Sequence, residues 1–194
     1  MLGTRIILMG MDKHPNMSTQ STNAEMLCAA NYTIPLFWLL LFSETELESF
    51  SVADDSVVAG EESAKYPILI ADSSAVVARL NERYNHLIPF LNVNDADLLQ
   101  RWLSFITKQN HPVFAIDTYE LWCSKDDPSS LYDEIAALLK ELDTLTTDTD
   151  TKQQLQMLVS SKQWAVVVGE WDCFGRVWLV IFFLKPMAVN YGGY

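Results

Sequence analysis

The chain has 194 residues, 49% of them hydrophobic and 20% charged, and this composition is typical of one folded domain rather than of a disordered segment. Its formal net charge of −12 argues against nucleic acid and anionic membranes as partners, because their phosphate groups would repel the chain. Three widely spaced cysteines without a CxxC pair, and an N-terminal apolar run too short for a signal peptide, predict a protein of the reducing cytoplasm.

Two elements are predicted before the first long apolar segment. TRIILMG, Thr4–Gly10, is a short apolar run that ends at a glycine, and this pattern predicts a buried strand. AEMLCAA follows a polar loop and predicts a helix that begins near Asn23 or Ala24. The polar residues from Asn31 to Thr33 end this helix.

The segment Ile34–Phe42 has no polar side chain. It is too short to cross a membrane as a helix, for which about 20 apolar residues are needed. Thr33 suits the N-cap and Pro35 suits the first turn, so we expect a helix from Leu36 to Phe42. A helix that is apolar on all sides belongs in a core, and we expect this one to be central and buried.

The segment Glu44–Glu62 holds seven acids and no base, and it predicts a loop with a short helix or an edge strand. YPILIAD, Tyr66–Asp72, predicts a second buried strand, and Asp72 or Ser73 caps a helix that runs to about Leu91. The expected apolar positions of that helix are Val76, Leu80, Tyr84, Leu87, Ile88 and Leu91. Its solvent side is expected to carry Arg79, Glu82 and Arg83.

The second half of the chain predicts three further helices, a strand and a hairpin. Helices are expected from Asp95, from Asp127 and around Lys152–Ser160, and a third strand begins at Pro112. Two β-rich runs, WAVVVGEW and RVWLVIFFL, flank DCFG and predict a C-terminal hairpin. The expected core positions of the first two helices are Leu98, Leu99, Trp102, Leu103, Phe105, Ile106, Leu131, Ile135, Leu138, Leu139 and Leu142.

Together these elements predict one compact α+β domain over residues 1–194, with about six helices around a small mixed sheet and a C-terminal β-hairpin. No repeat and no interdomain linker interrupts the sequence. A parallel βα core with an appended hairpin is the alternative architecture.

Common catalytic motifs are absent from the sequence, which contains no GxGxxG, P-loop, HExxH or GxSxG pattern. The weaker candidates are a cysteine with a histidine for nucleophilic catalysis, or two carboxylates three residues apart for acid–base work or cation binding. These pairs are Cys123 with His111, Cys28 with His14, and Asp117 with Glu120. Buried cysteines, surface histidines and a solvated strand end are the ordinary interpretation, so no catalytic residue, metal or cofactor is predicted.

Acidic side chains gather in two clusters, Glu44–Glu62 and Asp117–Asp150, and the second has ten acids against Lys125 and Lys140. Such clusters are ordinary solvated surface, or they steer the chain toward a basic protein partner with nearby aromatic residues as anchors. On the second interpretation, the partner-binding residues are Asp54, Asp55, Glu61, Glu62, Asp117, Tyr119, Glu120, Trp122, Asp126 and Asp127.

Several segments together resemble an uncharacterised family of bacterial proteins. YTIPLFWLLLFS, Tyr32–Ser43, is similar to the family's Y-D-I-P-L helix that ends in L-L-S, with Thr33 in place of the Asp. ILIADSSAVVARL, Ile68–Leu80, resembles its A-I-x-G-D…R-L strand and helix, and IDTYELW resembles its E-x-x-E strand end. The order of the motifs agrees over roughly Thr4 to Leu145, and the C-terminal hairpin lies outside the match.

The resemblance implies a role in bacterial conflict, as an immunity protein for a toxin of a type VI secretion or polymorphic toxin system, and it brings no catalytic residues. We therefore expect a non-enzymatic toxin inhibitor that binds a cognate toxin effector in the cytoplasm by protein–protein interaction and occludes its active site. The alternatives are a small hydrolase with a Cys/His or paired-carboxylate site, and a structural or regulatory adaptor. The sequence leaves open the chemistry of the toxin, the contact surface and the oligomeric state.

Overall fold

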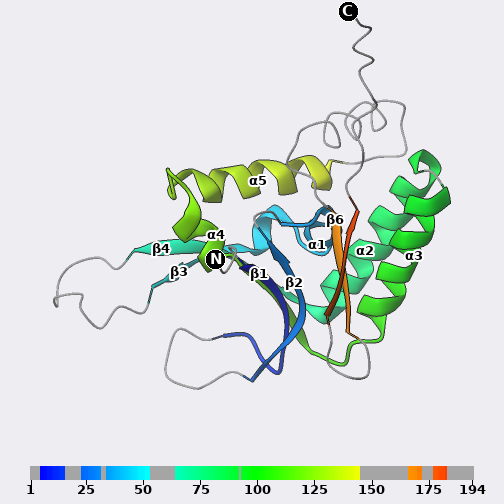
Figure 1. Cartoon of the computed structure of the whole chain (residues 1–194), viewed down its shortest axis with the longest axis horizontal. Coiled ribbons are helices and arrows are strands. Elements are labelled where there is room, and N and C mark those ends of the chain that lie inside the picture. Colours follow the sequence, from blue (N-terminus) through cyan, green and yellow to red (C-terminus); the bar gives the residue numbers. More distant parts are fainter. Residues whose placement is uncertain are drawn as a thin grey trace, which may run out of the picture.

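The computed structural model describes residues 5–15, 23–31, 34–52, 64–91, 93–144, 166–171 and 177–182. At its centre is a five-stranded sheet with the strand order β2-β1-β5-β4-β3, in which every neighbouring pair is antiparallel (Figure 1). The strands are β1 (Arg5–Met11), β2 (Ala24–Asn31), β3 (Leu47–Ser51), β4 (Lys65–Asp72) and β5 (Val113–Asp117). The fold class is therefore α+β, as predicted.

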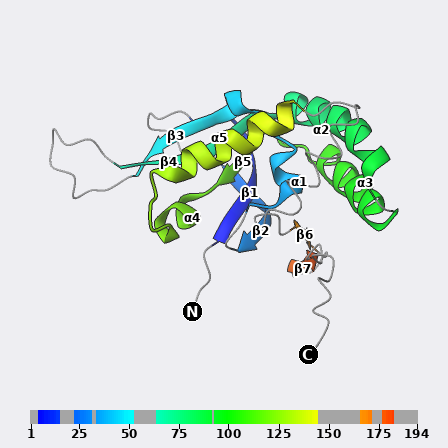
Figure 2. The same cartoon turned by 90° about the horizontal axis from the view of Figure 1, so that it is seen from above.

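The prediction of a mixed sheet is wrong, and so is the alternative of a parallel βα core. A single crossover helix between β4 and β5 would make these strands parallel. The structure has two helices there, α2 (Ser73–Leu87) and α3 (Val93–Thr107), which lie side by side and return the chain to the end of the sheet that it left (Figure 2). Asp72 at the end of β4 consequently pairs with Val113 at the start of β5, and the two strands are antiparallel.

The described residues contain five α-helices, where about six are predicted. Besides α2 and α3, the helices are α1 (Leu36–Leu39), α4 (Tyr119–Ser124) and α5 (Ser130–Asp143), with 3₁₀ turns η1 (Glu44–Glu46) and η2 (Ile88–Phe90). The predicted helix around Lys152–Ser160 lies outside the described residues. Among the described helices, none combines the length and apolar composition that a membrane crossing requires.

The sheet buries apolar side chains on both faces. One face packs with the helices in the main core, to which the strands contribute residues such as Ile6, Leu8, Leu69, Phe114 and Ile116. Successive side chains of a strand point to opposite faces, and the alternate positions form a second, smaller cluster. That cluster consists of Met11, Ile68, Ile70, Val113 and Ala115, with Met9, Phe50 and Tyr66 packed against it. Burial on both faces explains why β1, β4 and β5 have almost continuous apolar sequences.

The predicted helix at AEMLCAA is instead strand β2. Ala, Glu, Met and Leu have high helix propensity, which explains the prediction, but tertiary pairing overrides propensity. β2 pairs with β1 along its whole length, and the register shifts between Leu8 and Met9. The shift leaves Leu27 as an extra residue, so Leu27 and Cys28 are buried although they are adjacent in a strand.

The segment Ile34–Phe42 is buried along its whole length, as predicted. Its helix is shorter than expected, because α1 comprises one turn and ends at a C-cap on Leu40. Pro35 occupies the N-cap, and Thr33 lies outside the described residues. The acidic segment that follows begins with η1 and the edge strand β3, which confirms the predicted short helix or edge strand.

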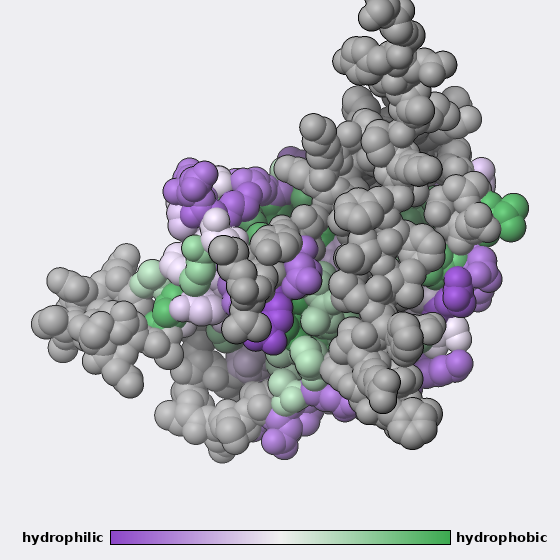
Figure 3. Space-filling view, viewed as in Figure 1, coloured by the Kyte–Doolittle hydropathy of each residue, from purple (hydrophilic) through white to green (hydrophobic). Residues whose placement is uncertain are grey.

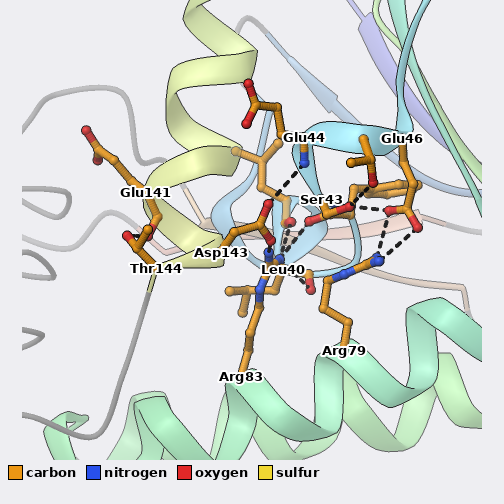
Figure 4. Close-up of polar contacts among 12 residues, drawn as sticks. Leu40, Ser43, Glu44, Glu46, Arg79, Arg83, Glu141, Asp143 and Thr144 are labelled. Atoms are coloured by element: carbon orange, nitrogen blue, oxygen red, sulfur yellow. Dashed lines mark hydrogen bonds and ion pairs between the residues drawn. The ribbon is translucent and has the colours of Figure 1, made fainter.

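Two arginines of α2 bind buried carbonyl groups at the end of α1 and just after it (Figure 4). Arg83 Nη1 donates to the carbonyl oxygens of Leu39 at 3.1 Å, Leu40 at 3.0 Å and Phe42 at 2.7 Å. Its Nη2 donates to Asp143 Oδ1 at 2.5 Å, which joins this turn to the end of α5. These contacts compensate the backbone groups that a one-turn helix leaves unpaired in the core.

The prediction that Arg83 faces solvent is wrong, because only 4% of its surface is exposed. Arg79 is partly buried; it donates to the carbonyl oxygen of Leu41 at 2.7 Å and to both carboxylate oxygens of Glu46. Glu46 in turn accepts from the backbone N–H of Ser43 at 2.9 Å. The arginines therefore hold α1, η1 and α5 together.

Two further strands, β6 (Val166–Trp171) and β7 (Val177–Phe182), form a separate antiparallel pair. β6 lies beside β2 and near α1 (Figure 1). Residues 172–176, where the turn of the predicted hairpin falls, lie outside the described residues, so the hairpin stays a prediction.

Candidate functional site

The end of β5 and the helix α4 carry four of the predicted partner-binding residues. Asp117 is the last residue of β5, and its Oδ1 accepts a hydrogen bond from the backbone N–H of Tyr119 at 2.9 Å. Between them, the buried Thr118 donates its hydroxyl to the carbonyl oxygen of Pro67 in β4. These two contacts turn the chain from strand to helix against β4 and fix where Tyr119, Glu120 and Trp122 lie.

Four rings from three elements lie in contact at this end of the sheet, and we call them the aromatic cluster: Phe50, Tyr66, Tyr119 and Trp122. The ring centroids of Tyr66 and Tyr119 are 5.3 Å apart in an edge-to-face arrangement, and those of Tyr119 and Trp122 are 6.2 Å apart and stacked. Tyr66 also lies 6.5 Å from Trp122 and 6.5 Å from Phe50. Tyr119 is 39% exposed, so the cluster reaches the surface.

The predicted carboxylate pair, Asp117 and Glu120, is brought together by the start of α4. Burial raises the pKa of the Asp117 carboxyl, the N–H of Tyr119 lowers it again in part, and the negative charge of Glu120 raises it further. Burial, with the charges of Asp117 and Tyr119, raises the pKa of Tyr66 to about 12. The phenols of Tyr66 and Tyr119 and the Asp117 carboxylate are thus close enough to interact electrostatically.

The cations beside α4 are engaged with other carboxylates. Arg5 donates its backbone N–H to Glu120 Oε2 at 2.6 Å, and its Nε lies 3.7 Å from Glu120 Oε1. Lys125, just after α4, pairs with Glu134 of α5. Within the described residues, Asp117 makes no ion pair, and its only hydrogen bond is the one from Tyr119.

Asp126 and Asp127 follow α4 in the turn that leads to α5. Asp127 Oδ1 accepts from the backbone N–H of Ser129 at 3.1 Å and from its hydroxyl at 2.5 Å, so Asp127 stabilises the turn before α5. The predicted helix start at Asp127 is too early, because Ser129 is the N-cap and α5 begins at Ser130. Asp126 is exposed. Figure 3 shows mostly hydrophilic side chains at the place of α5, and paler, less hydrophilic ones at the place of α4. The remaining predicted residues, Asp54, Asp55, Glu61 and Glu62, lie outside the described residues.

The two predicted cysteine–histidine pairs do not form. His111 precedes β5, whereas Cys123 lies on α4 after the other end of that strand. His111 packs on Gly10 and lies 3.3 Å from Glu25, whereas Cys123 is exposed on α4. Cys28 is buried in the main core, while His14 lies 3.3 Å from Glu48.

No group of three or more His, Cys, Asp or Glu side chains is placed to hold a metal ion in the part of the chain that the structure describes.

Sequence reasoning missed two members of the aromatic cluster, Phe50 and Tyr66. These residues pair across β3 and β4 and point to the same face as Ile68 and Ile70. Phe50 lies between Ser49 and Ser51, and Tyr66 precedes Pro67. This alternation indicates that the two rings lie on one face of the sheet. Their position beside α4 depends on the strand order and could not be read from the sequence.

Comparison of the chain with protein-family models, with curated proteins and with solved structures finds no match.

Proposed function

We propose that the chain is a non-enzymatic immunity protein that binds a cognate bacterial toxin effector in the cytoplasm and neutralises it by occluding the toxin's active site. The observation that supports this proposal best is the surface formed by α4 and the turn after it, where an exposed tyrosine is backed by other rings and bordered by carboxylates. We call this the α4 surface; its residues are Tyr66, Asp117, Tyr119, Glu120, Trp122, Asp126 and Asp127.

The composition of the α4 surface suits tight binding to a basic protein. Tyrosine and tryptophan are the residues that most often supply the energetic centre of a protein interface. Their rings here are fixed by contacts with one another and with the backbone turn at Thr118, so little conformational freedom is lost on binding. The surrounding carboxylates and the net charge of −12 accelerate association with a positively charged surface.

A second candidate is a hydrolase that uses Asp117 and Glu120 as an acid–base pair. The raised pKa of Asp117 beside a second carboxylate favours it, because perturbed carboxyl groups are common in active sites. Glu120, however, is bound to Arg5, and no metal-ligand set accompanies the pair in the described residues. Compared with hydrolysis, protein binding accounts for more residues of the α4 surface, because it also explains the aromatic side chains.

The first test is affinity purification of the tagged chain from its native host, followed by measurement of association rates with the protein that co-purifies. We expect one stoichiometric partner with a basic surface. Asp126→Lys should slow association several-fold at low salt and weaken the salt dependence of the rate. The matched control is Glu82→Lys, which makes the same charge change at an exposed position of α2.

Two results would count against this proposal. The first is the absence of any stoichiometric partner together with a turnover activity that Asp117→Asn abolishes, which would favour the hydrolase. The second is an association rate that Asp126→Lys and Glu82→Lys change equally, which would remove the α4 surface from the proposal and leave only the net charge.

A further inference from the structure

The Asp117 carboxylate is in an unusual position for a charged group. It lies at the end of a central strand, opposite Ile7 in β1 and Ile68 in β4, and it is partly buried. Partly buried carboxylates are ordinarily paired with a cation or with several hydrogen-bond donors. In the described part of the chain, this carboxylate receives only the N–H of Tyr119, although both its oxygens can accept more.

The two described cations beside α4 do not compensate Asp117. Arg5 is bound to Glu120, and Lys125 is bound to Glu134. Burial and the negative charge of Glu120 raise the pKa of the Asp117 carboxyl. No positive charge of the described residues counteracts this rise. Within the described residues, the Asp117 carboxylate is therefore uncompensated, and a cation that approaches this site would be attracted to it.

The aromatic cluster supplies the second half of a cation site. The face of a tyrosine or tryptophan ring attracts a cation electrostatically, and the attraction grows when water is partly excluded. Tyr119 is both exposed and fixed, since its ring contacts those of Tyr66 and Trp122. Its backbone N–H is bound to Asp117, so the exposed ring and the uncompensated carboxylate belong to one turn of chain.

We propose that Asp117, Tyr66, Tyr119 and Trp122 form a receptor for a single arginine side chain of the partner protein. The guanidinium is planar, so it stacks on the exposed ring while its N–H groups donate to the carboxylate, and it is more weakly hydrated than the ammonium of lysine. The inference rests on the proposed function, because it names the chemistry by which the α4 surface recognises its partner. Trp122 and Tyr66 hold the ring of Tyr119, and Asp117 sets the preference for positive charge.

The test is a two-dimensional NMR titration of the isotope-labelled full chain with N-acetyl-arginine amide. The control ligand is N-acetyl-citrulline amide, which has a similar shape and no charge. We expect the arginine probe to shift the backbone amides of Tyr119 and Glu120 and the indole N–H of Trp122, and to saturate with a Kd of about 1 mM. The citrulline probe should produce no saturable shift at these residues.

Two variants with the same change in charge separate a specific receptor from general acidic attraction. Asp117→Asn keeps an oxygen that accepts the N–H of Tyr119, so we expect a native-like spectrum and at least about tenfold weaker binding of the arginine probe. Glu82→Gln removes an exposed carboxylate of α2, away from the α4 surface, and should leave binding unchanged. A Tyr119→Ala variant with a native-like spectrum should also lose binding.

Equal responses to the arginine and citrulline probes would overturn the inference, and so would equal weakening by Asp117→Asn and Glu82→Gln. Because the probe is not the partner protein, this result would refute the arginine receptor and leave the immunity proposal to the co-purification test. Conversely, a chain that binds the arginine probe at Tyr119 but has no toxin partner would support the receptor and refute the proposed function.

Discussion

Replacing Arg83 with methionine tests the interpretation that this buried arginine holds three elements together. The substitution keeps much of the apolar stem and removes the donors to Leu39, Leu40 and Phe42, which lie 2.7 to 3.1 Å away. It also leaves Asp143 without its ion-pair partner. Each buried carbonyl group that loses its donor costs about 1–3 kcal/mol, and breaking a buried ion pair from one side costs about 3–5 kcal/mol in total.

The estimate for Arg83→Met is about 3–5 kcal/mol of unfolding free energy rather than the full sum over the carbonyl groups. Two effects reduce the sum: the variant no longer buries a guanidinium, and Asp143 is 36% exposed, so water hydrates it after the change. We also expect Arg83→Lys to be destabilising. One ammonium on a flexible stem cannot reach the three carbonyl oxygens and the carboxylate together.

Urea unfolding at neutral pH, followed by far-ultraviolet circular dichroism, measures this loss. The matched control is Arg101→Met on α3, because Arg101 is 58% exposed and pairs with Asp97 four residues earlier. That control should cost less than about 1 kcal/mol. If Arg83→Met costs no more than Arg101→Met, the contacts around α1 do not stabilise the fold and the reasoning is refuted.

Two further substitutions test the sheet. Gly10→Ala would place a Cβ 2.2 Å from Cδ2 of His111, so the ring or the backbone must shift. We expect a loss of about 1–3 kcal/mol in urea unfolding, and a loss that persists in a His111→Ala background would contradict this steric cause. For Tyr66, whose pKa is raised from 10.0 to about 12 in the folded chain, stability should fall as the pH rises through this interval, because the unfolded state ionises first. Tyr66→Phe should lose less stability between about pH 9 and about pH 11 than the wild type does, and an equal loss would show that Tyr66 does not contribute.

The elements that the sequence predicts best are strands buried on both faces and helices with one buried face, because burial determines the spacing of their apolar residues. β1, β4 and β5 are buried on both faces, and their apolar runs predict strands. In α5, Leu131, Ile135, Leu139 and Leu142 are buried as their spacing predicts. Strand β2 could not be predicted in this way, because its residues favour a helix and only pairing with β1 makes them a strand.

The burial of Arg83 agrees with its place in the helical spacing of α2, although its residue type favours exposure. The buried residues of α2 are Val76, Leu80, Arg83 and Leu87, and their spacing of four, three and four places all of them on one helical face. The sequence predicts that Arg83 faces solvent, because charged side chains are rarely buried. The polar groups that make burial favourable here, the carbonyls after α1, come from a distant part of the chain.

The candidate site was partly predictable for a similar reason. Asp117, Tyr119, Glu120 and Trp122 are close in sequence, so a helical turn after β5 was enough to bring them together. Tyr66 joins them because β4 pairs with β5, and that neighbourhood follows from the α2–α3 connection rather than from any local pattern.

The most direct test of the immunity role is the growth of cells that express the co-purified partner protein. The partner alone should stop growth, and co-expression of this chain should restore it, whereas co-expression of Asp126→Lys should restore it less well than Glu82→Lys does. A partner that is harmless when expressed alone, or toxicity that the chain does not relieve, would contradict the proposed function.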